Sequence, residues 1–483
     1  MGLTVAKPGL ERYYEEKPTA ARKNHPAGGV HHPRKYEEFI MSAFLKSLCK
    51  IAIPVTLQSM LQSSFSMIDQ VMIGQLGETG IAAVGLCGNF SLIFSVMLGA
   101  VSTVAGILIA QFLGAGEKKE AWRSLDVSLL WGLLLSGLFL GAAVGFPRLI
   151  LGLYTADTGI IDSGALYFRL IGFSYVPMAL SSLLSAWMRC KEQAAIPFAA
   201  SLASVAVNTS LNYLLIFGKL GLPPLGIPGA ALASLSSQLV NFLFVLLGFV
   251  ILEKREGSSP LWSLRFEKLS HMDYMMMILP ILASEFLWSL GQNVESAVYG
   301  HLGSQALAAY TLTCPVQGLM VGALSGLSAA AGVLIGKRLG QKEYDKAYME
   351  SKKIMLVGLL GAVVVSVGLI LLSNTYTSLY RVDTAVKQLG KTLLVVFALY
   401  APVKVQNMIL GGGILRSGGN TRLIMAIDIL GTWLVGIPLC FLGAYVFHWG
   451  IVGVYALLTT EEIFRLLVSL AVFKKKNWMV SLS

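Results

Sequence analysis

Charged residues are scarce in this sequence. Only 13% of its 483 residues are Asp, Glu, Lys or Arg, whereas an average soluble protein has about 25%. Hydrophobic residues make up 55%, and the mean hydropathy is +0.69. The scarcity of charge excludes an ordinary soluble globular protein, and the high hydropathy excludes an intrinsically disordered one. The composition therefore indicates a protein that crosses a membrane many times.

Cysteine and catalytic motifs are also scarce. The five cysteines are scattered without a CxxC or zinc-finger spacing, so neither a disulfide framework nor a metal site is expected. Gly336-Lys337 lacks the upstream glycine of a P-loop, and no HExxH motif or Ser/His/Asp arrangement is recognisable. We therefore expect no enzyme, no ATP-driven pump and no cofactor.

The first 40 residues lack the apolar run of a signal peptide. We predict a polar cytoplasmic tail over residues 1–45. Three histidines in this tail are more typical of a solvated segment than of a metal site (His25, His31 and His32).

Long apolar segments dominate the rest of the chain. A membrane-spanning helix needs about 20 mostly apolar residues, and twelve segments meet this need. They lie near 48–73, 81–113, 125–146, 165–188, 194–217, 226–252, 274–300, 305–336, 354–373, 391–415, 423–447 and 450–473. The sequence predicts an all-α polytopic membrane protein with twelve transmembrane helices.

The basic residues lie mainly on one side of these predicted spans. With the N-terminal tail inside, 29 of the 37 Lys and Arg residues fall in inner regions, and only five fall in outer ones. The positive-inside rule then predicts a cell-membrane protein with both termini in the cytoplasm. Because topology explains the formal charge of +11, we do not expect nucleic-acid binding.

The two halves of the chain resemble each other at an offset of 226 residues. Pro54 then falls on Pro280, and Asp69 falls on Glu295. Six spans per half is an even number, so both halves enter the membrane from the same side. We predict two six-helix lobes related by a pseudo-two-fold axis along the membrane normal, with the substrate path between them. The predicted units are an N-lobe (46–252), a cytoplasmic linker (253–272), a C-lobe (273–475) and a short cytoplasmic tail (476–483).

Small residues repeat within several predicted spans. We expect them to allow close helix packing at Gly137, Gly141, Gly145, Gly332, Gly336, Gly340 and Gly411 to Gly413.

Ionisable residues inside a membrane are costly and usually face a cavity or a partner. In the first half, Asp69 lies late in the first predicted span. We expect a functional role for it, with a position at the outer interface as the alternative. Asn208 and Asn212 are four residues apart and therefore share one helix face. Their amides are candidates either for coordinating an ion or substrate or for bonding neighbouring helices.

The second half carries more ionisable residues within its predicted spans: Glu285, Glu295, Lys404, Asp428, Glu461, Glu462 and Arg465. Glu461 and Arg465 form an i,i+4 pair, and we expect Lys404 to pair with Asp428 or Glu285. Structural pairing is the alternative to a functional role for this whole cluster. Glu285 lies well inside the seventh span, where a desolvated carboxylate is a candidate proton carrier.

Several segments together resemble the bacterial branch of the multidrug and toxic compound extrusion (MATE) family. These are Ile53-Pro54 with SMIDQVMIGQLG, then AQFLGAGEKKEAW, NYLLIFG with GIPGAALAS, SEFLWSLGQ, ILRSGGNTRLIMAID and TTEEIFRLL. The resemblance covers about residues 45–475. It implies two six-helix lobes, a V-shaped cleft, and antiport of organic cations against H⁺ or Na⁺.

The resemblance also implies roles for individual residues. Asp69 matches the family's carboxylate in the first span, and Asn208 and Asn212 match an Asn-then-acid pair in the fifth span. Because the second member is Asn here, Asp69 is the only acid expected at that site, which leaves a Na⁺ ion there in question. Glu285 and Asp428 match acidic positions in the seventh and eleventh spans.

We therefore expect an ion-coupled multidrug exporter, a monomer in membrane lipid, that carries cationic amphiphiles by alternating access. Asp69 and Glu285 would bind the coupling ion, and Glu295, Lys404, Glu461 and Glu462 would support them. The main alternative is a lipid-linked glycan flippase of the same superfamily, which would need basic residues in its cleft. A major-facilitator carrier, a channel and a membrane scaffold are less well supported.

Overall fold

The computed structural model describes residues 33–75, 78–219, 221, 223–257, 271–380 and 382–482. The side chains of residues 33–42, 65–71, 78 and 79 lie outside this description. The predicted tail histidines, most of the predicted linker and the Asp69 side chain therefore fall outside the described part of the chain.

The described part of the first half forms eight helices. They are α2 (Pro33–Gly74), α3 (Glu78–Gly114), α4 (Lys118–Gly145), α5 (Pro147–Gly152), α6 (Thr158–Gly172), α7 (Tyr175–Cys190), α8 (Ala195–Phe217) and α9 (Ile227–Arg255). Because α2 begins at Pro33, the end of the predicted polar tail is already helical. The fourth predicted span is two helices, α6 and α7, which are bent by 40° relative to each other.

The second half contains helices of three kinds. The α-helices are α10 (His271–His301), α11 (Ser304–Gly340), α12 (Tyr344–Ser378), α13 (Thr384–Asn407), α14 (Thr421–Ile429), α15 (Ile437–Phe441) and α16 (Ile451–Lys475). Three π-helical segments interrupt or extend them, namely η2 (Met408–Leu415), η4 (Leu430–Gly436) and η5 (Leu442–Val446), and η3 (Arg416–Gly418) is a 3₁₀ turn.

Within the described residues, ten helical segments are long and apolar enough to cross a membrane, and α6 with α7 forms an eleventh, broken span. The twelfth is α16, which has the length of a span but carries Glu461, Glu462 and Arg465 near its middle. The predicted all-α architecture with twelve spans is confirmed.

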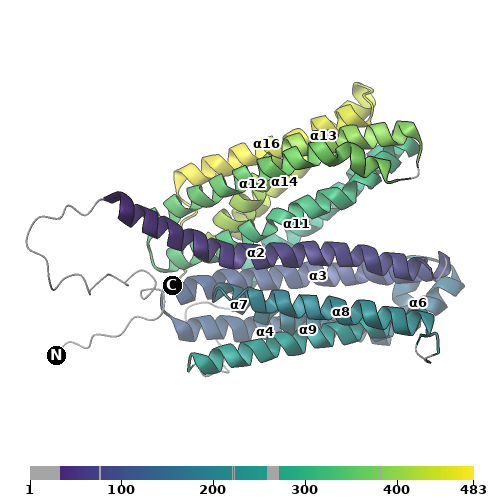
Figure 1. The fold of residues 1–483 in the computed structure, drawn as a ribbon, viewed down its shortest axis with the longest axis horizontal. Coiled ribbons are helices and arrows are strands. Elements are labelled where there is room, and N and C mark those ends of the chain that lie inside the picture. The colour runs from purple at the N-terminus through teal and green to yellow at the C-terminus, as the bar shows by residue number, and fades with distance from the viewer. Residues whose placement is uncertain are drawn as a thin grey trace, which may run out of the picture.

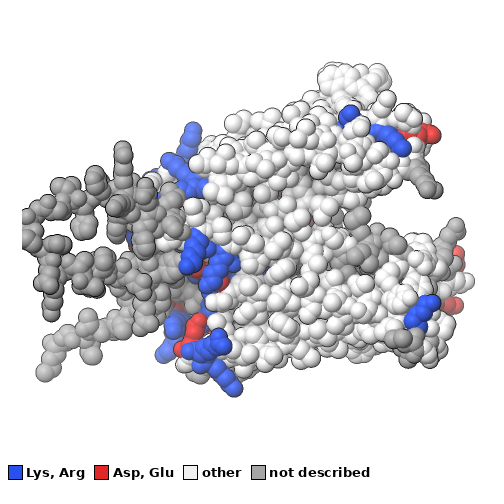
Figure 2. Space-filling view, viewed as in Figure 1, with Lys and Arg blue, Asp and Glu red and all other residues white. Residues whose placement is uncertain are grey.

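The helices form two bundles that lie together at one end and diverge at the other (Figure 1). The first half builds one bundle, and the helices from α10 onward build the second. Helix α2 begins and α16 ends at the end where the bundles meet. Lys and Arg side chains gather at this end, which we call the basic end, and Figure 2 shows the surface hollowed between the bundles at the opposite end.

The buried apolar residues explain this divergence. One hydrophobic cluster contains residues from both halves, including Phe112, Trp187, Ile335 and Leu410. Two further clusters each belong to one half, around Phe94 and Phe168 in the first and around Phe397 and Tyr455 in the second. Lipid gives no hydrophobic driving force between helices, so close van der Waals packing holds the halves together where they share a core.

Glycines allow the helix backbones of the two halves to touch in the shared core. A Cβ at Gly340 of α11 would lie 2.7 Å from the Gln111 carbonyl carbon of α3, and a Cβ at Gly114 would lie 2.7 Å from Cα of Lys337. The predicted close packing is confirmed at Gly336, Gly340 and Gly413. It is wrong for Gly137, Gly141, Gly145 and Gly411, where an added Cβ would meet nothing within 4 Å.

The segment after α16 packs against both halves at the basic end, and we call this contact region the junction. Trp478 is fully buried and stacks on Phe473. The Leu482 backbone N–H donates to Oε1 of Gln111 at 2.7 Å, and Nε2 of Gln111 donates to the Ser417 carbonyl at 2.7 Å. The last described residues thus connect both halves at the basic end.

We predict that Gly340→Ala lowers the free energy of unfolding by about 1–3 kcal/mol, because the methyl group overlaps the α3 backbone. Gly137→Ala is the control, since its methyl group meets open space and alanine favours a helix over glycine. Thermal unfolding of the purified protein in detergent measures both. Equal melting temperatures for the two variants would contradict the close backbone contact.

Candidate transport site

The ionisable residues of the second half gather where its helices lose α-helical geometry. Pro402 lies inside α13, and three consecutive glycines follow in η2. Proline removes a backbone donor and glycine weakens an α-helix, so the tenth span ends in π-helical turns. Such turns often occur at functional sites because they widen the helix locally.

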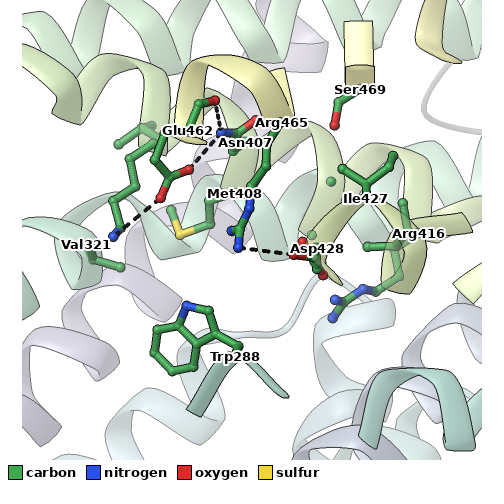
Figure 3. Close-up of a pocket in the computed structure, with 15 residues that line it drawn as sticks. Trp288, Val321, Asn407, Met408, Arg416, Ile427, Asp428, Glu462, Arg465 and Ser469 are labelled. Carbon is green, nitrogen blue, oxygen red and sulfur yellow. Dashed lines mark hydrogen bonds and ion pairs between the residues drawn. The ribbon is translucent and has the colours of Figure 1, made fainter. Parts of the chain in front are cut away.

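Helix α16 supplies the centre of an ion-pair network (Figure 3). Glu461 and Arg465 form the predicted i,i+4 pair, with Nη2 of Arg465 3.7 Å from Oε1 of Glu461. Nη2 of Arg465 also donates to the Thr432 hydroxyl and to the Asp428 carbonyl. Arg465 thereby ties α16 to α14 and η4.

Lys404 pairs with Glu462, at 3.5 Å between Nζ and Oε1. The predicted pairing with Asp428 or Glu285 is wrong. Lys404 lies on α13, which packs directly against α16. A carboxylate of α16 is therefore within its reach. The other Glu462 oxygen accepts from Nδ2 of Asn407 at 2.8 Å, so both oxygens of this carboxylate have partners.

Two glycines of η4 make room for these charged side chains. A Cβ at Gly431 would overlap the Arg465 side chain, and a Cβ at Gly436 would overlap the Glu461 carboxylate. The network therefore depends on glycine at both positions of the eleventh span.

Beside this network, Asp428 accepts a hydrogen bond from the Ser284 hydroxyl at 2.6 Å. Glu285, the next residue on α10, is half-buried and experiences the charges of both Arg416 and Asp428. A cavity of about 200 Å³ lies here, lined by residues that include Trp288, Lys404, Arg416, Asp428, Glu462 and Arg465. The structure thus places Asp428, Lys404 and Glu462 on the cavity wall, whereas Glu285, Glu295 and Glu461 do not line it.

Glu295 and Glu461 have incomplete hydrogen bonding. Oε2 of Glu295 accepts from Nε2 of Gln292 at 3.2 Å. Oε1 of Glu295 and Oε2 of Glu461 are buried without a hydrogen-bond partner among the described residues. The two carboxylates also repel each other electrostatically. An ionised carboxylate without partners is costly in a protein interior, and a bound proton or cation removes that cost.

The first half contributes a smaller polar cluster on α8. Nδ2 of Asn212 donates to Oδ1 of Asn208 at 2.6 Å, so the two amides share one helix face as their spacing predicts. Nδ2 of Asn208 lies 3.3 Å from the hydroxyls of Ser234 and Ser237 on α9. This geometry fits bonding between helices. Helix α2, which carries Asp69, also packs against α8.

Several residues of the site were not predicted from the sequence: Ser284, Gln292, Asn407, Thr432 and Trp288. Small polar residues are common within the predicted spans, so residue type alone does not mark them. Asn407 has a weak signal, because it directly precedes the glycine-rich end of the tenth span. Among the described residues, no three His, Cys, Asp or Glu side chains gather as a metal site would require.

Two bundles of spans that share one core, diverge at the opposite end and enclose charged residues define a polytopic membrane transporter of the two-lobe class. The MatE family model matches residues 54–214 and 280–442, one segment in each half. The chain therefore belongs to the MatE family. This is a family of transporters rather than enzymes, as predicted.

Relatives match nearly the whole chain. The probable multidrug resistance protein NorM of Thermotoga maritima is 25% identical over 440 residues, which cover 90% of this chain and 93% of that protein. The uncharacterized transporter YisQ of Bacillus subtilis is 22% identical, with coverage of 90% and 95%.

Solved structures share the fold. The MATE transporter VcmN of Vibrio cholerae in the bent form superposes with a TM-score of 0.81 at 19% identity, covering 90% of this chain and 97% of that one. A MOP superfamily transporter from Pyrococcus furiosus gives a TM-score of 0.79 at 18% identity, with coverage of 89% and 95%.

We predict that Arg465→Met lowers the free energy of unfolding by about 3–5 kcal/mol, because it leaves the buried α16 carboxylates without their central cation. Arg148→Gln is the control. Arg148 pairs with Asp162 at 2.9 Å, but their side chains are 73% and 64% exposed, so its loss costs at most about 1 kcal/mol. Thermal unfolding in detergent measures both, and an equally small effect at Arg465 would show that the network contributes little.

Proposed function

We propose that this protein is an ion-coupled antiporter that uses H⁺ or Na⁺ to export cationic amphiphilic compounds across the cell membrane. The observation that carries the proposal is the buried acidic cluster of the second half, in which Glu295 and Glu461 each keep one oxygen without a partner among the described residues. A proton or small cation bound there would give these oxygens the partner they lack. Relatives named as multidrug resistance proteins support export as the direction of transport.

We assign the basic end to the cytoplasm, with both termini there, because basic residues favour the inner side of a membrane. The hollow between the bundles then opens outward (Figure 2). We also divide the chain into an N-lobe, a cytoplasmic linker and a C-lobe, as the repeat suggests. Alternating access would close this hollow and separate the halves at the basic end.

Two acidic positions would couple the ion to transport. Asp69 and Glu295 occupy equivalent places in the repeat. In the C-lobe, a proton on Glu295 relieves its repulsion with Glu461. In the N-lobe, Asp69 with Asn208 and Asn212 would bind the ion or the substrate. Glu285 and Asp428 would present negative charge to a cationic compound near the cavity. These carboxylates favour antiport of a cationic compound over the flipping of a lipid-linked glycan across the membrane.

The test uses proteoliposomes in which a pH gradient and a sodium gradient are imposed separately. Uphill movement of ethidium under one gradient identifies the coupling ion. If neither gradient drives ethidium uphill, the antiport proposal is wrong.

We predict that Glu295→Gln lowers gradient-driven ethidium transport about tenfold or more, because glutamine can neither take up a proton nor offer Na⁺ a charged carboxylate. Equilibrium binding of ethidium to the purified variant should change much less. Asp162→Asn, an exposed carboxylate outside the cluster, is the matched control and should transport normally. Normal coupled transport by Glu295→Gln would remove this residue from the mechanism.

Asp69→Asn tests the N-lobe in the same assay. We expect a loss of coupled transport by a protein that remains folded, as judged by its unchanged melting temperature. Wild-type transport by a folded Asp69→Asn variant would assign coupling to the C-lobe alone.

A salt bridge joins the halves at the basic end. Nζ of Lys337 on α11 lies 2.8 Å from Oε1 of Glu192, in the loop between α7 and α8. Burial raises the pKa of Glu192, but the charge of Lys337, its hydrogen bond and further contacts lower this pKa below its ordinary value. A carboxyl group whose pKa is lowered in the folded protein adds to its stability at pH values above the ordinary pKa. This stabilisation is lost as the pH falls through the lowered pKa. The bridge is therefore fully formed at neutral pH.

We predict that Glu192→Gln loosens this end and speeds alkylation of Cys190 several-fold. Cys190 is buried here, whereas Cys49 and Cys314 are exposed and are first replaced by serine. A membrane-impermeant maleimide added to inside-out vesicles reports the rate, with Arg148→Gln as the control. An unchanged rate would show that the salt bridge does not hold the basic end closed.

A further inference from the structure

A second cavity lies between the two halves, on the basic-end side of the hollow. Its volume is about 360 Å³. Helices α2, α3 and α7 of the first half and α11, η2 and η3 of the second half form its wall. The size is within the range of pockets that hold small organic ligands.

Arg189 and Arg416 are the charged residues on this wall, and no carboxylate lines it. Arg189 lies in the last turn of α7, and Arg416 follows η2, so each arginine ends the fourth span of its own half. The two halves thus bring equivalent positive charges to one cavity. Hydroxyl groups complete the polar part of the wall, from Ser59, Ser102, Thr103, Ser325, Ser328 and Ser417.

Neither guanidinium has a hydrogen bond or ion pair from its side chain to another group in the described part of the chain. Nε of Arg416 is buried without a partner there. Glu192, three residues after Arg189, is already engaged by Lys337. Buried charges in proteins are normally paired, and arginine is suited to binding carboxylate or phosphate groups with two parallel hydrogen bonds.

Arg416 also lines the first cavity, beside Asp428 (Figure 3). Met408 and Gly412 line both cavities as well, so the acidic network and the pair of arginines adjoin. Asp428 accepts from Ser284, and no ion pair forms between Arg416 and Asp428 or Glu285 within 4.0 Å. The charge of Arg416 therefore remains available to a ligand.

We propose that Arg189 and Arg416 form an anion site between the halves that binds a carboxylate group of a transported compound. The compound would place its cationic part against the acidic network and its carboxylate between the arginines. This inference rests on the proposed export function for its ligand. The arginines hold the carboxylate from both halves at once, so binding there also stabilises the closed basic end.

The test measures equilibrium binding to the purified full-length protein by fluorescence anisotropy. The probes are a rhodamine with a free carboxylate and its methyl ester, which differ only in the anionic group. We expect Arg189→Gln and Arg416→Gln each to weaken binding of the acid about tenfold, because each removes a charged hydrogen-bond donor. Binding of the ester should change less than twofold, and Arg416→Lys should recover part of the loss.

Arg148→Gln, on the exposed surface, is the matched control and should bind both dyes normally. Equal loss of acid and ester binding in both glutamine variants would overturn the proposal in favour of a general structural role. Unchanged binding of the acid dye would also overturn the proposal. A change confined to the ester would overturn it too, because Arg416 would then act only as a counter-charge for the carboxylates of the protein. Ester transport in proteoliposomes reports separately on the proposed antiport, so the two ideas fail independently.

Discussion

A charge held away from water needs a partner, and the organisation of the second half follows from this need. Five carboxylates and three basic groups influence one another there, from α10, α13, η3, α14 and α16 (Glu285, Glu295, Asp428, Glu461, Glu462, Lys404, Arg416 and Arg465). Only Lys404 and Arg465 form ion pairs with these carboxylates in the described part of the chain, with Glu462 and Glu461, so the other carboxylates lack a basic partner. The π-helical turns and the glycines of η4 provide the space in which these groups meet. Carboxylates without partners make the network less stabilising. The same carboxylates allow it to take up a small cation.

The number and position of the spans could be predicted from the sequence, because hydropathy over about 20 residues depends on local composition. The bend between α6 and α7 and the π-helical turns could not be predicted. They depend on how each span packs against its neighbours, and the sequence offers only proline and glycine as indirect signs. The close backbone contact at Gly340 and the empty surroundings of Gly137 illustrate the same limit. A glycine pattern suggests close packing, but only the fold decides which glycines are used.

The candidate site was predictable in part. The shared face of Asn208 and Asn212 and the pair of Glu461 with Arg465 follow from helical spacing, and both are observed. The partner of Lys404 could not be derived, since it depends on which helix α13 packs against. Arg189 and Arg416 are more than two hundred residues apart in the sequence. Arg189 and Arg416 line one cavity because the two similar halves pack against each other there.

The C-terminal segment has a consequence for how the molecule is made. Trp478 and Leu482 complete the contacts that hold Gln111 against Ser417, and they follow all of the described membrane-spanning helices in the sequence. The helices of the first bundle are therefore made well before the segment whose backbone N–H bonds to Gln111. The packing between the halves at the basic end is complete only once α16 and the residues after it have been made, so removing Trp478 and the residues after it would leave every span in the chain and this end without its last contacts.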